Sequence, residues 1–137
     1  MTELIEFITE EWLLFAALAF LIAIFFYREF SQGGARLSTH ELTIAVNNDS
    51  AIILDVREKK EFNAGHIIDA INIPHGEIGN SLGKLNKYRD KQIVIVDSMG
   101  QHAGTVIQQL TANDFNATRL RGGITEWQQQ NLPLVKQ

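Results

Sequence analysis

The chain has 137 residues, which is enough for one domain and an appendage. It contains no cysteine, and this excludes disulfides, thiolate metal sites and a cysteine nucleophile supplied by the chain itself. From residue 37 onward ten Lys/Arg stand against eleven Asp/Glu, so the chain offers neither a basic footprint for nucleic acid nor an acidic tail.

The N-terminal segment, residues 1–30, is predicted to contain a single transmembrane helix over about 12–27. These sixteen residues include no charged residue and no Asn, Gln, Gly or Pro, and the aromatic residues Trp12 and Tyr27 stand at the two ends, where membrane interfaces favour them. Four residues are expected to extend the apolar face of this helix backwards: Leu4, Ile5, Phe7 and Ile8. The alternatives are a cleaved secretory signal, which would want a basic start rather than this acidic one, and a buried helix of a soluble protein.

The flanking charges predict the orientation of this helix. No Lys or Arg precedes it, whereas Arg28 and Arg36 follow it. The positive-inside rule therefore predicts a single-pass protein of the cell inner membrane, with its N-terminus outside and its C-terminal domain in the cytoplasm. Residues 31–36 are interpreted as a short flexible linker, in which Gly33-Gly34 would end the helix.

Residues 37–137 are predicted to form an α/β domain with a mainly parallel sheet flanked by helices. Ser38 and Glu41 have the spacing of a capping box, and the continuous apolar runs 51–56 and 92–96 are typical of strands buried on both faces. In chain order the expected elements are a helix from Ser38, a strand at 51–56, a helix at 58–64, a strand at 70–73, a loop with a short helix at 75–90, a strand at 92–96, a helix around 103–110, a strand at 117–120 and a helix at 124–130. In such a sheet the working site lies beyond the carboxyl ends of the strands, here Arg57 onward and 97–102.

Two ordered motifs in this domain resemble those of the rhodanese homology (rhodanese-like) domain family. The first is Leu54-Asp55-Val56-Arg57-Glu58, followed by Glu61-Phe62, Gly65-His66-Ile67 and Ala70-Ile71-Asn72-Ile73-Pro74; the second is Gly122-Gly123-Ile124 with Trp127 and Leu132-Pro133. The resemblance covers nearly all of 37–137 and implies the rhodanese fold. Together with the predicted anchor, the chain is similar to the YibN-type membrane-anchored rhodanese-like proteins of Gram-negative bacteria.

The loop that carries the family's chemistry departs from the family pattern. The family's loop reads Cys-x-x-Gly-x-Arg, and the resemblance implies that its cysteine carries sulfur as a persulfide inside a cradle of backbone N–H groups. The corresponding residues here are Asp97, Ser98, Met99, Gly100, Gln101 and His102. A carboxylate cannot carry a transferable sulfur, and an ionised Asp97 would repel thiosulfate. The phosphatase relatives of the family need the same cysteine and arginine, so no catalytic residue is predicted.

The other signature residues are expected to have structural roles. Asp97 is interpreted as a turn or N-cap residue that satisfies the donors of its own loop. The cluster Asp55, Arg57 and Glu61 is expected to lock loop to sheet through hydrogen bonds and ion pairs. His66, after Gly65, is expected to be a hydrogen-bonded supporting residue, and Trp127, after Gly122 and Gly123, to lie in the core beside Ile124. A metal site made of His66, His75 and His102 has no spacing logic, and no metal or cofactor is predicted.

Three functions are consistent with these residues. The first is a catalytically inactive, membrane-tethered interaction module, whose partners would be the lipid bilayer and another inner-membrane protein. The second is a sulfurtransferase that works with a cysteine donated by a partner, which only the fold supports. The third is a small-anion binding module that uses the N–H cradle, although the carboxylate of Asp97 would already fill it.

Overall fold

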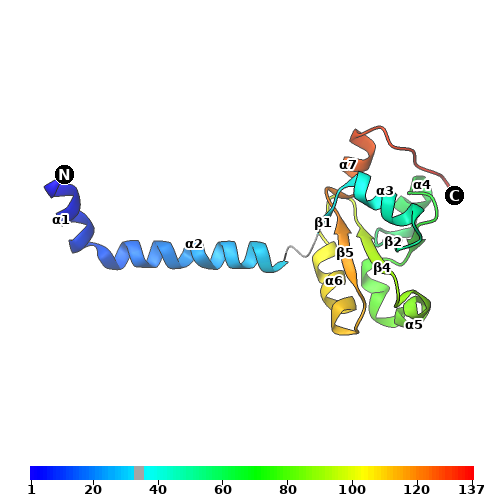
Figure 1. Cartoon of the computed structure of the whole chain (residues 1–137), viewed down its shortest axis with the longest axis horizontal. Coiled ribbons are helices and arrows are strands. Elements are labelled where there is room, and N and C mark those ends of the chain that lie inside the picture. Colours follow the sequence, from blue (N-terminus) through cyan, green and yellow to red (C-terminus); the bar gives the residue numbers. More distant parts are fainter. Residues whose placement is uncertain (33–35) are drawn as a thin grey trace. The chain divides into compact units, whose positions relative to one another are not determined.

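The computed structural model describes residues 1–32 and 36–137, with backbone only over 29–32, and the chain divides into two compact units, Met1–Gly33 and Gly34–Gln137 (Figure 1). The first unit consists of helices α1 (Thr2–Glu10) and α2 (Trp12–Gln32). Every described side chain of α2 is exposed, including its large apolar ones. The second unit holds all of the described strands.

The first unit corrects the expectation that one continuous helix runs back from residue 12 to residue 4. Glu11 ends α1, and the axes of α1 and α2 meet at 73°. The Thr9 hydroxyl donates to the Glu6 carbonyl over 2.8 Å, a back-bond that bends helices, and Glu10 with Glu11 places two carboxylates at a helix C-terminus, where the helix dipole disfavours them. Among the described helices none is long and apolar enough to cross a membrane alone, but α1 and α2 as a bent pair meet that test of length and composition.

The linker predicted at 31–36 differs from the structure at both of its ends. Helix α2 continues through Gln32, and Arg36 begins strand β1 (Arg36–Leu37). The Gly33-Gly34 pair that was expected to end the helix lies outside the described residues.

The second unit is built on a parallel sheet, as predicted, but the sheet has five strands rather than the four expected, in the order β1-β5-β4-β2-β3. Besides β1, its strands are β2 (Ala51–Asp55), β3 (Ile71–Asn72), β4 (Gln92–Val96) and β5 (Ala117–Leu120). The central strands β2 and β4 pair over five residues, from Ala51 opposite Gln92 to Asp55 opposite Val96. Because they are covered on both faces, their residues are apolar in succession rather than in alternation.

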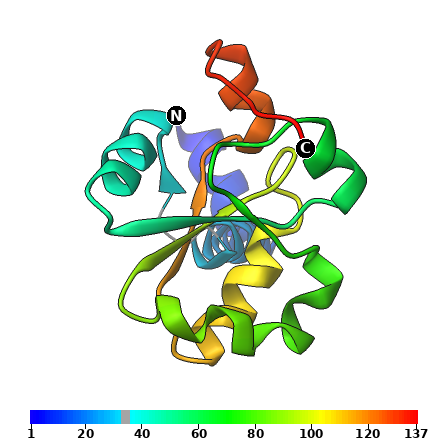
Figure 2. The same cartoon turned by 90° about the vertical axis from the view of Figure 1, so that its right-hand side faces the viewer.

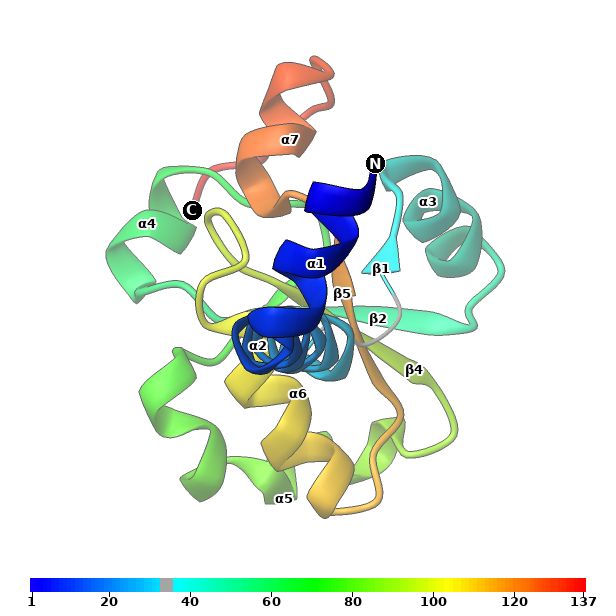
Figure 3. The ribbon, with the colours of Figure 1, turned by 90° about the vertical axis from the view of Figure 1, so that its left-hand side faces the viewer.

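Helices cover both faces of this sheet. Helices α3 (Thr39–Asn47) and α7 (Gly123–Gln129) pack on one face, and α5 (Leu82–Leu85) and α6 (Ala103–Ala112) pack on the other (Figure 3). The remaining helices are α4 (Lys59–Ala64) and the 3-10 helices η1 (His75–Asn80) and η2 (Asn86–Tyr88). Leu54, Ile95 and Val106 lie in the core on the face covered by α5 and α6. Ile53 and Val94 lie in the core on the face covered by α3 and α7.

The predicted helix start at Ser38 is confirmed. The Ser38 hydroxyl accepts a hydrogen bond from the backbone N–H of Glu41 over 3.1 Å. This bond satisfies one of the donors that a helix N-terminus leaves without a partner. It fixes α3 directly after β1, so that Leu42 is completely buried.

Candidate functional site

The two loops that were predicted to form the site lie at the carboxyl ends of β2 and β4. Residues 97–102, drawn in yellow in Figure 2, follow β4 directly, and Val56 and Arg57 follow β2. The backbone N–H of Val56 donates to the carbonyl of Val96 over 3.0 Å, so the loops start side by side. Parallel strands bring their carboxyl ends to one edge of the sheet, and that is why these distant segments meet.

Asp97 is the buried centre of its loop, with only 5% of its surface exposed. Its Oδ1 accepts from the backbone N–H of Ser98 over 2.8 Å, and its Oδ2 accepts from the backbone N–H of His102 over 2.6 Å. One carboxylate thus satisfies donors at both ends of the loop. This confirms the interpretation of Asp97 as a residue that satisfies its own loop.

The loop is also fastened to the start of α7. The carbonyl of Asp97 accepts from the N–H of Ile124 over 2.9 Å, and the carbonyl of Ser98 accepts from both the N–H and the hydroxyl of Thr125. Gly123 makes this approach possible, because a Cβ at that position would lie 2.2 Å from the Asp97 carbonyl oxygen and its φ is +60°. Gly122 and Gly123 were singled out by the second motif, whereas no sequence signal pointed to Thr125.

The rest of the loop faces solvent. Met99 is 67% exposed, Gln101 is exposed, and Gly100 turns the chain with φ +93°. His102 stands at the arginine position of the family pattern, and its ring stacks on that of His75 at 3.8 Å between centroids. Each ring has a carboxylate nearby, since His102 Nδ1 lies 3.3 Å from Asp97 Oδ2 and His75 Nε2 lies 3.8 Å from Glu58 Oε1.

Asp55 and Arg57 form a buried ion pair under the site, with side chains 1% and 7% exposed. Arg57 Nη2 lies 2.7 Å from Asp55 Oδ2, Arg57 Nε and the Arg57 backbone N–H donate to the same carboxylate, and Nη2 also donates to the carbonyl of Gly65 over 2.7 Å. The amide of Asn72 bridges the carbonyls of Asp55 and Arg57. The geometry therefore ties β2 to the end of α4, which is the structural role expected of these residues.

Glu61 does not join this pair among the described contacts. It forms a capping box with Glu58 instead, because its Oε2 accepts from the backbone N–H of Glu58 over 3.3 Å. The cluster expected of Asp55, Arg57 and Glu61 is therefore wrong in its third member. The spacing of Glu58 and Glu61 at the start of a helix is the signal that favours the cap.

His66 and Trp127 both serve the fold around the site. His66 is 7% exposed, stacks on Phe62 at 3.8 Å and bonds the Phe62 carbonyl through Nδ1 over 2.8 Å. Trp127 is 6% exposed, packs in the core with Ile124 and donates to the carbonyl of Pro133 over 3.0 Å. Both positions agree with the supporting roles that the sequence indicated.

The three histidines considered as metal ligands do not converge. His75 and His102 stack face to face, whereas the Nδ1 of His66 is bonded to the Phe62 carbonyl. Among the side chains of residues 1–28 and 36–137, no group of three His, Asp or Glu is arranged to hold a metal ion.

Removing the Asp97 carboxylate is expected to turn the loop into an anion site. In an Asp97→Ala chain the N–H groups of Ser98 and His102 lose their acceptor, and the free energy of unfolding should fall by about 1–3 kcal/mol. Sulfate should then recover part of this loss by accepting from the same donors. The measurement is urea unfolding of the full chain in detergent, in sulfate and in chloride at equal ionic strength.

The wild-type chain is the control for that experiment, because sulfate stabilises folded proteins in general. An equal effect of sulfate on the wild-type and Asp97→Ala chains would show that the loop does not present the N–H cradle.

Comparisons with known proteins agree with this geometry. The family profile described as Rhodanese-like domain matches residues 38–130. The uncharacterized protein YibN of Escherichia coli (strain K12) is 30% identical over 141 residues, which cover 99% of each chain. The putative sulfurtransferase YtwF of Bacillus subtilis (strain 168) is 29% identical and matches 71% of this chain and 93% of its own. A crystal structure of a rhodanese-related protein from Thermoplasma volcanium superposes with a TM-score of 0.69 at 26% identity, covering 76% of this chain and all (100%) of that one.

Proposed function

This chain belongs to the rhodanese-like domain family, and on that basis we propose that it is a membrane-anchored, catalytically inactive member that acts as a protein-interaction module at the bacterial inner membrane. The observation that carries the proposal is the buried, doubly hydrogen-bonded carboxylate of Asp97 at the position of the family's cysteine. The scaffold around it is intact, since the loop and the Asp55–Arg57 pair make their hydrogen bonds and Gly123 lets the start of α7 approach the loop.

The composition of the chain argues against sulfur transfer by this chain alone. No residue of the sequence is a cysteine, so no atom of the chain can hold a persulfide. Thiosulfate would also meet the negative charge of Asp97, and like charges about 4 Å apart repel by roughly 1 kcal/mol in water and by more in a partly dry site. A sulfurtransferase would therefore need a partner's cysteine.

The membrane anchor is supported by the exposed apolar surface of α1 and α2. Large apolar side chains surround α2, for example Leu13, Phe20 and Phe25, each more than 60% exposed. Monomeric soluble proteins seldom expose a continuous apolar surface of this kind, and helices that are apolar all round are buried in protein or in lipid. In the proposed topology Arg28 and Arg36 lie on the cytoplasmic side.

Single cysteines test this topology cleanly, because the wild-type chain has none. Thr2→Cys and Asn48→Cys place a thiol before α2 and in the second unit, both at exposed positions. Against intact spheroplasts an impermeant maleimide should label the first variant and spare the second, which should react only after permeabilisation. The reverse pattern would contradict the orientation, and labelling of both in intact spheroplasts would contradict the anchor.

A photo-crosslinking residue at Phe20, in native membranes, tests the interaction role. The expected result is a reproducible adduct with a membrane protein that also forms with an Asp97→Ala chain, because the loop's chemistry is not needed for docking. Adducts with lipid alone would contradict the role. Labelling with ³⁵S-thiosulfate separates the alternative, because radioactivity on the captured partner that depends on this chain would indicate sulfur transfer instead.

A further inference from the structure

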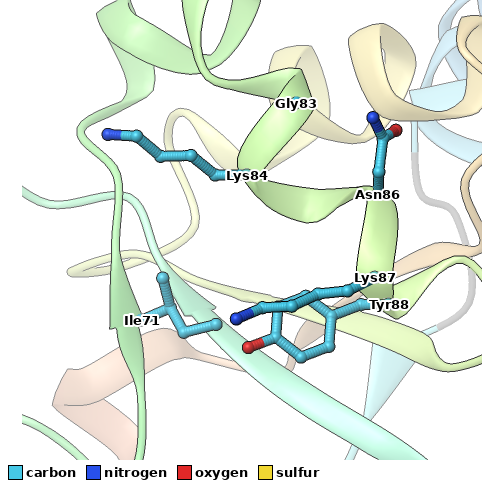
Figure 4. A pocket seen from close by; sticks show the side chains of 6 residues that line it. All are labelled: Ile71, Gly83, Lys84, Asn86, Lys87 and Tyr88. Atoms are coloured by element: carbon cyan, nitrogen blue, oxygen red, sulfur yellow. The ribbon is translucent and has the colours of Figure 1, made fainter.

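A shallow hollow of about 630 Å³ lies at the edge strand β3 and shares no residue with the loop 97–102. Its lining consists of Ile71, Gly83, Lys84, Asn86, Lys87 and Tyr88 (Figure 4). In Figure 4 the side chains of Lys84, Lys87 and Tyr88 extend in the same direction, toward the side on which Ile71 lies. The lining includes no carboxylate.

The hollow lies in the most basic stretch of the chain. Residues 84–91 contain four Lys/Arg and one Asp. Two of these cations are already engaged, since Arg89 donates to the Asn113 carbonyl over 2.8 Å and Lys91 pairs with Asp49 at 2.6 Å. Lys84 and Lys87 make no ion pair with any described residue. The two lysines on the walls of the hollow therefore carry positive charges that no described carboxylate neutralises.

The base of the hollow is held in place by the core. Leu85, between the two lysines, is completely buried, and the half-buried Ile71 and Tyr88 pack against the same core cluster. The ammonium of Lys87 lies over the Tyr88 ring, 5.1 Å from its centre. Two ammonium groups and one hydroxyl thus face the same space above an apolar base.

We propose that this hollow binds a phosphate ester. Ammonium groups only donate hydrogen bonds, so the partner must be an acceptor, and two positive charges without a carboxylate favour an anion. The volume exceeds that of a bare phosphate ion and lies in the range of small-molecule sites, so the ligand brings an organic part that covers Ile71 and the Tyr88 ring. A soluble phosphorylated compound and the headgroup of an anionic phospholipid share this chemistry.

The test uses the full chain in lipid nanodiscs, followed by the amide NMR signals of residues 83–88. One arm titrates glycerol 3-phosphate, with glycerol as the neutral control, into nanodiscs of phosphatidylcholine. The other arm compares phosphatidylcholine nanodiscs with nanodiscs that contain phosphatidylglycerol. Saturable shifts in the first arm identify a soluble phosphate ester as the ligand, and shifts in the second arm alone identify the headgroup. No shift of these amides in either arm would overturn the proposal.

Charge reversal shows whether the hollow itself binds. Lys84→Glu with Lys87→Glu should weaken binding at least about tenfold, because each lysine near a phosphate contributes several-fold to affinity. Lys59→Glu with Lys60→Glu is the matched control, since it makes the same change of charge at two exposed lysines of α4. Equal losses in the two double variants, or unchanged binding in the first, would contradict a site at this hollow.

Discussion

Asp97→Cys combined with His102→Arg is expected to give the chain a persulfide that the wild-type chain cannot form. The backbone N–H groups of Ser98 and His102, which now donate to Asp97, would then surround the sulfur of the new cysteine. Such donors favour the thiolate, which is the nucleophile. The thiolate would take the outer sulfur of thiosulfate and release sulfite, and cyanide would then remove that sulfur as thiocyanate. Thiocyanate release should rise at least about tenfold above that of the control chain.

The control is Asp97→Ser with His102→Arg, which has the same shape at residue 97 but oxygen in place of sulfur. Intact-mass spectrometry after treatment with thiosulfate should show one added sulfur atom in the cysteine variant and none in the serine variant. If the folded cysteine variant takes up no sulfur, the loop lacks the shape of a persulfide cradle. The replacement of cysteine and arginine by Asp97 and His102 would then not be enough to explain the inactivity that we propose.

Asp55→Ala is expected to lower the free energy of unfolding by about 3–5 kcal/mol, because it leaves the buried guanidinium of Arg57 without its counter-charge. The carbonyl of Gly65 would be the remaining acceptor of Arg57 Nη2 among the described contacts. Urea unfolding of the full chain in detergent, in a Trp12→Phe background, measures this through the fluorescence of Trp127, the other tryptophan of the chain.

Asp49→Asn is the control for Asp55→Ala, since it removes the charge of an ion pair at the surface, and asparagine tolerates the left-handed backbone of residue 49, whose φ is +56°. Asp49 Oδ1 lies 2.6 Å from Lys91 Nζ, and this hydrogen bond raises the pKa of Lys91. Water can replace it, so the unfolding midpoint should hardly move. If the Asp55 variant lost no more free energy of unfolding than the Asp49 variant, solvent would have to reach Arg57.

The central sheet could be predicted from the sequence because its strands are buried on both faces. Residues 92–96 and 117–120 form strands with the predicted bounds, and 51–56 is one residue too long at its C-terminal end. The two-residue strand β1 was missed, because Arg36 and Leu37 carry no strand pattern and are ordered by pairing with Arg119 and Leu120. Pairing with a neighbouring strand, rather than a local sequence pattern, determines this element.

The site could be predicted less completely, for a similar reason. The role of Asp97 could be predicted, because a carboxylate at the start of a loop can accept hydrogen bonds from the N–H groups of nearby residues. The contact of Thr125 with Ser98, and the stacking of His75 on His102, join segments 27 residues apart in each case and leave no periodicity in the sequence. Glu61 was assigned to the wrong partner because the capping box with Glu58 competes with an ion pair that sequence alone makes equally plausible.

Thiocyanate release by the purified wild-type chain, with thiosulfate and cyanide as substrates, tests the proposed inactivity most directly. Asp97 is buried and satisfied, and no cysteine exists to take up sulfur, so the rate should equal that of the blank without protein at every concentration of the chain. A rate above the blank that increases in proportion to the amount of wild-type chain would contradict the proposal.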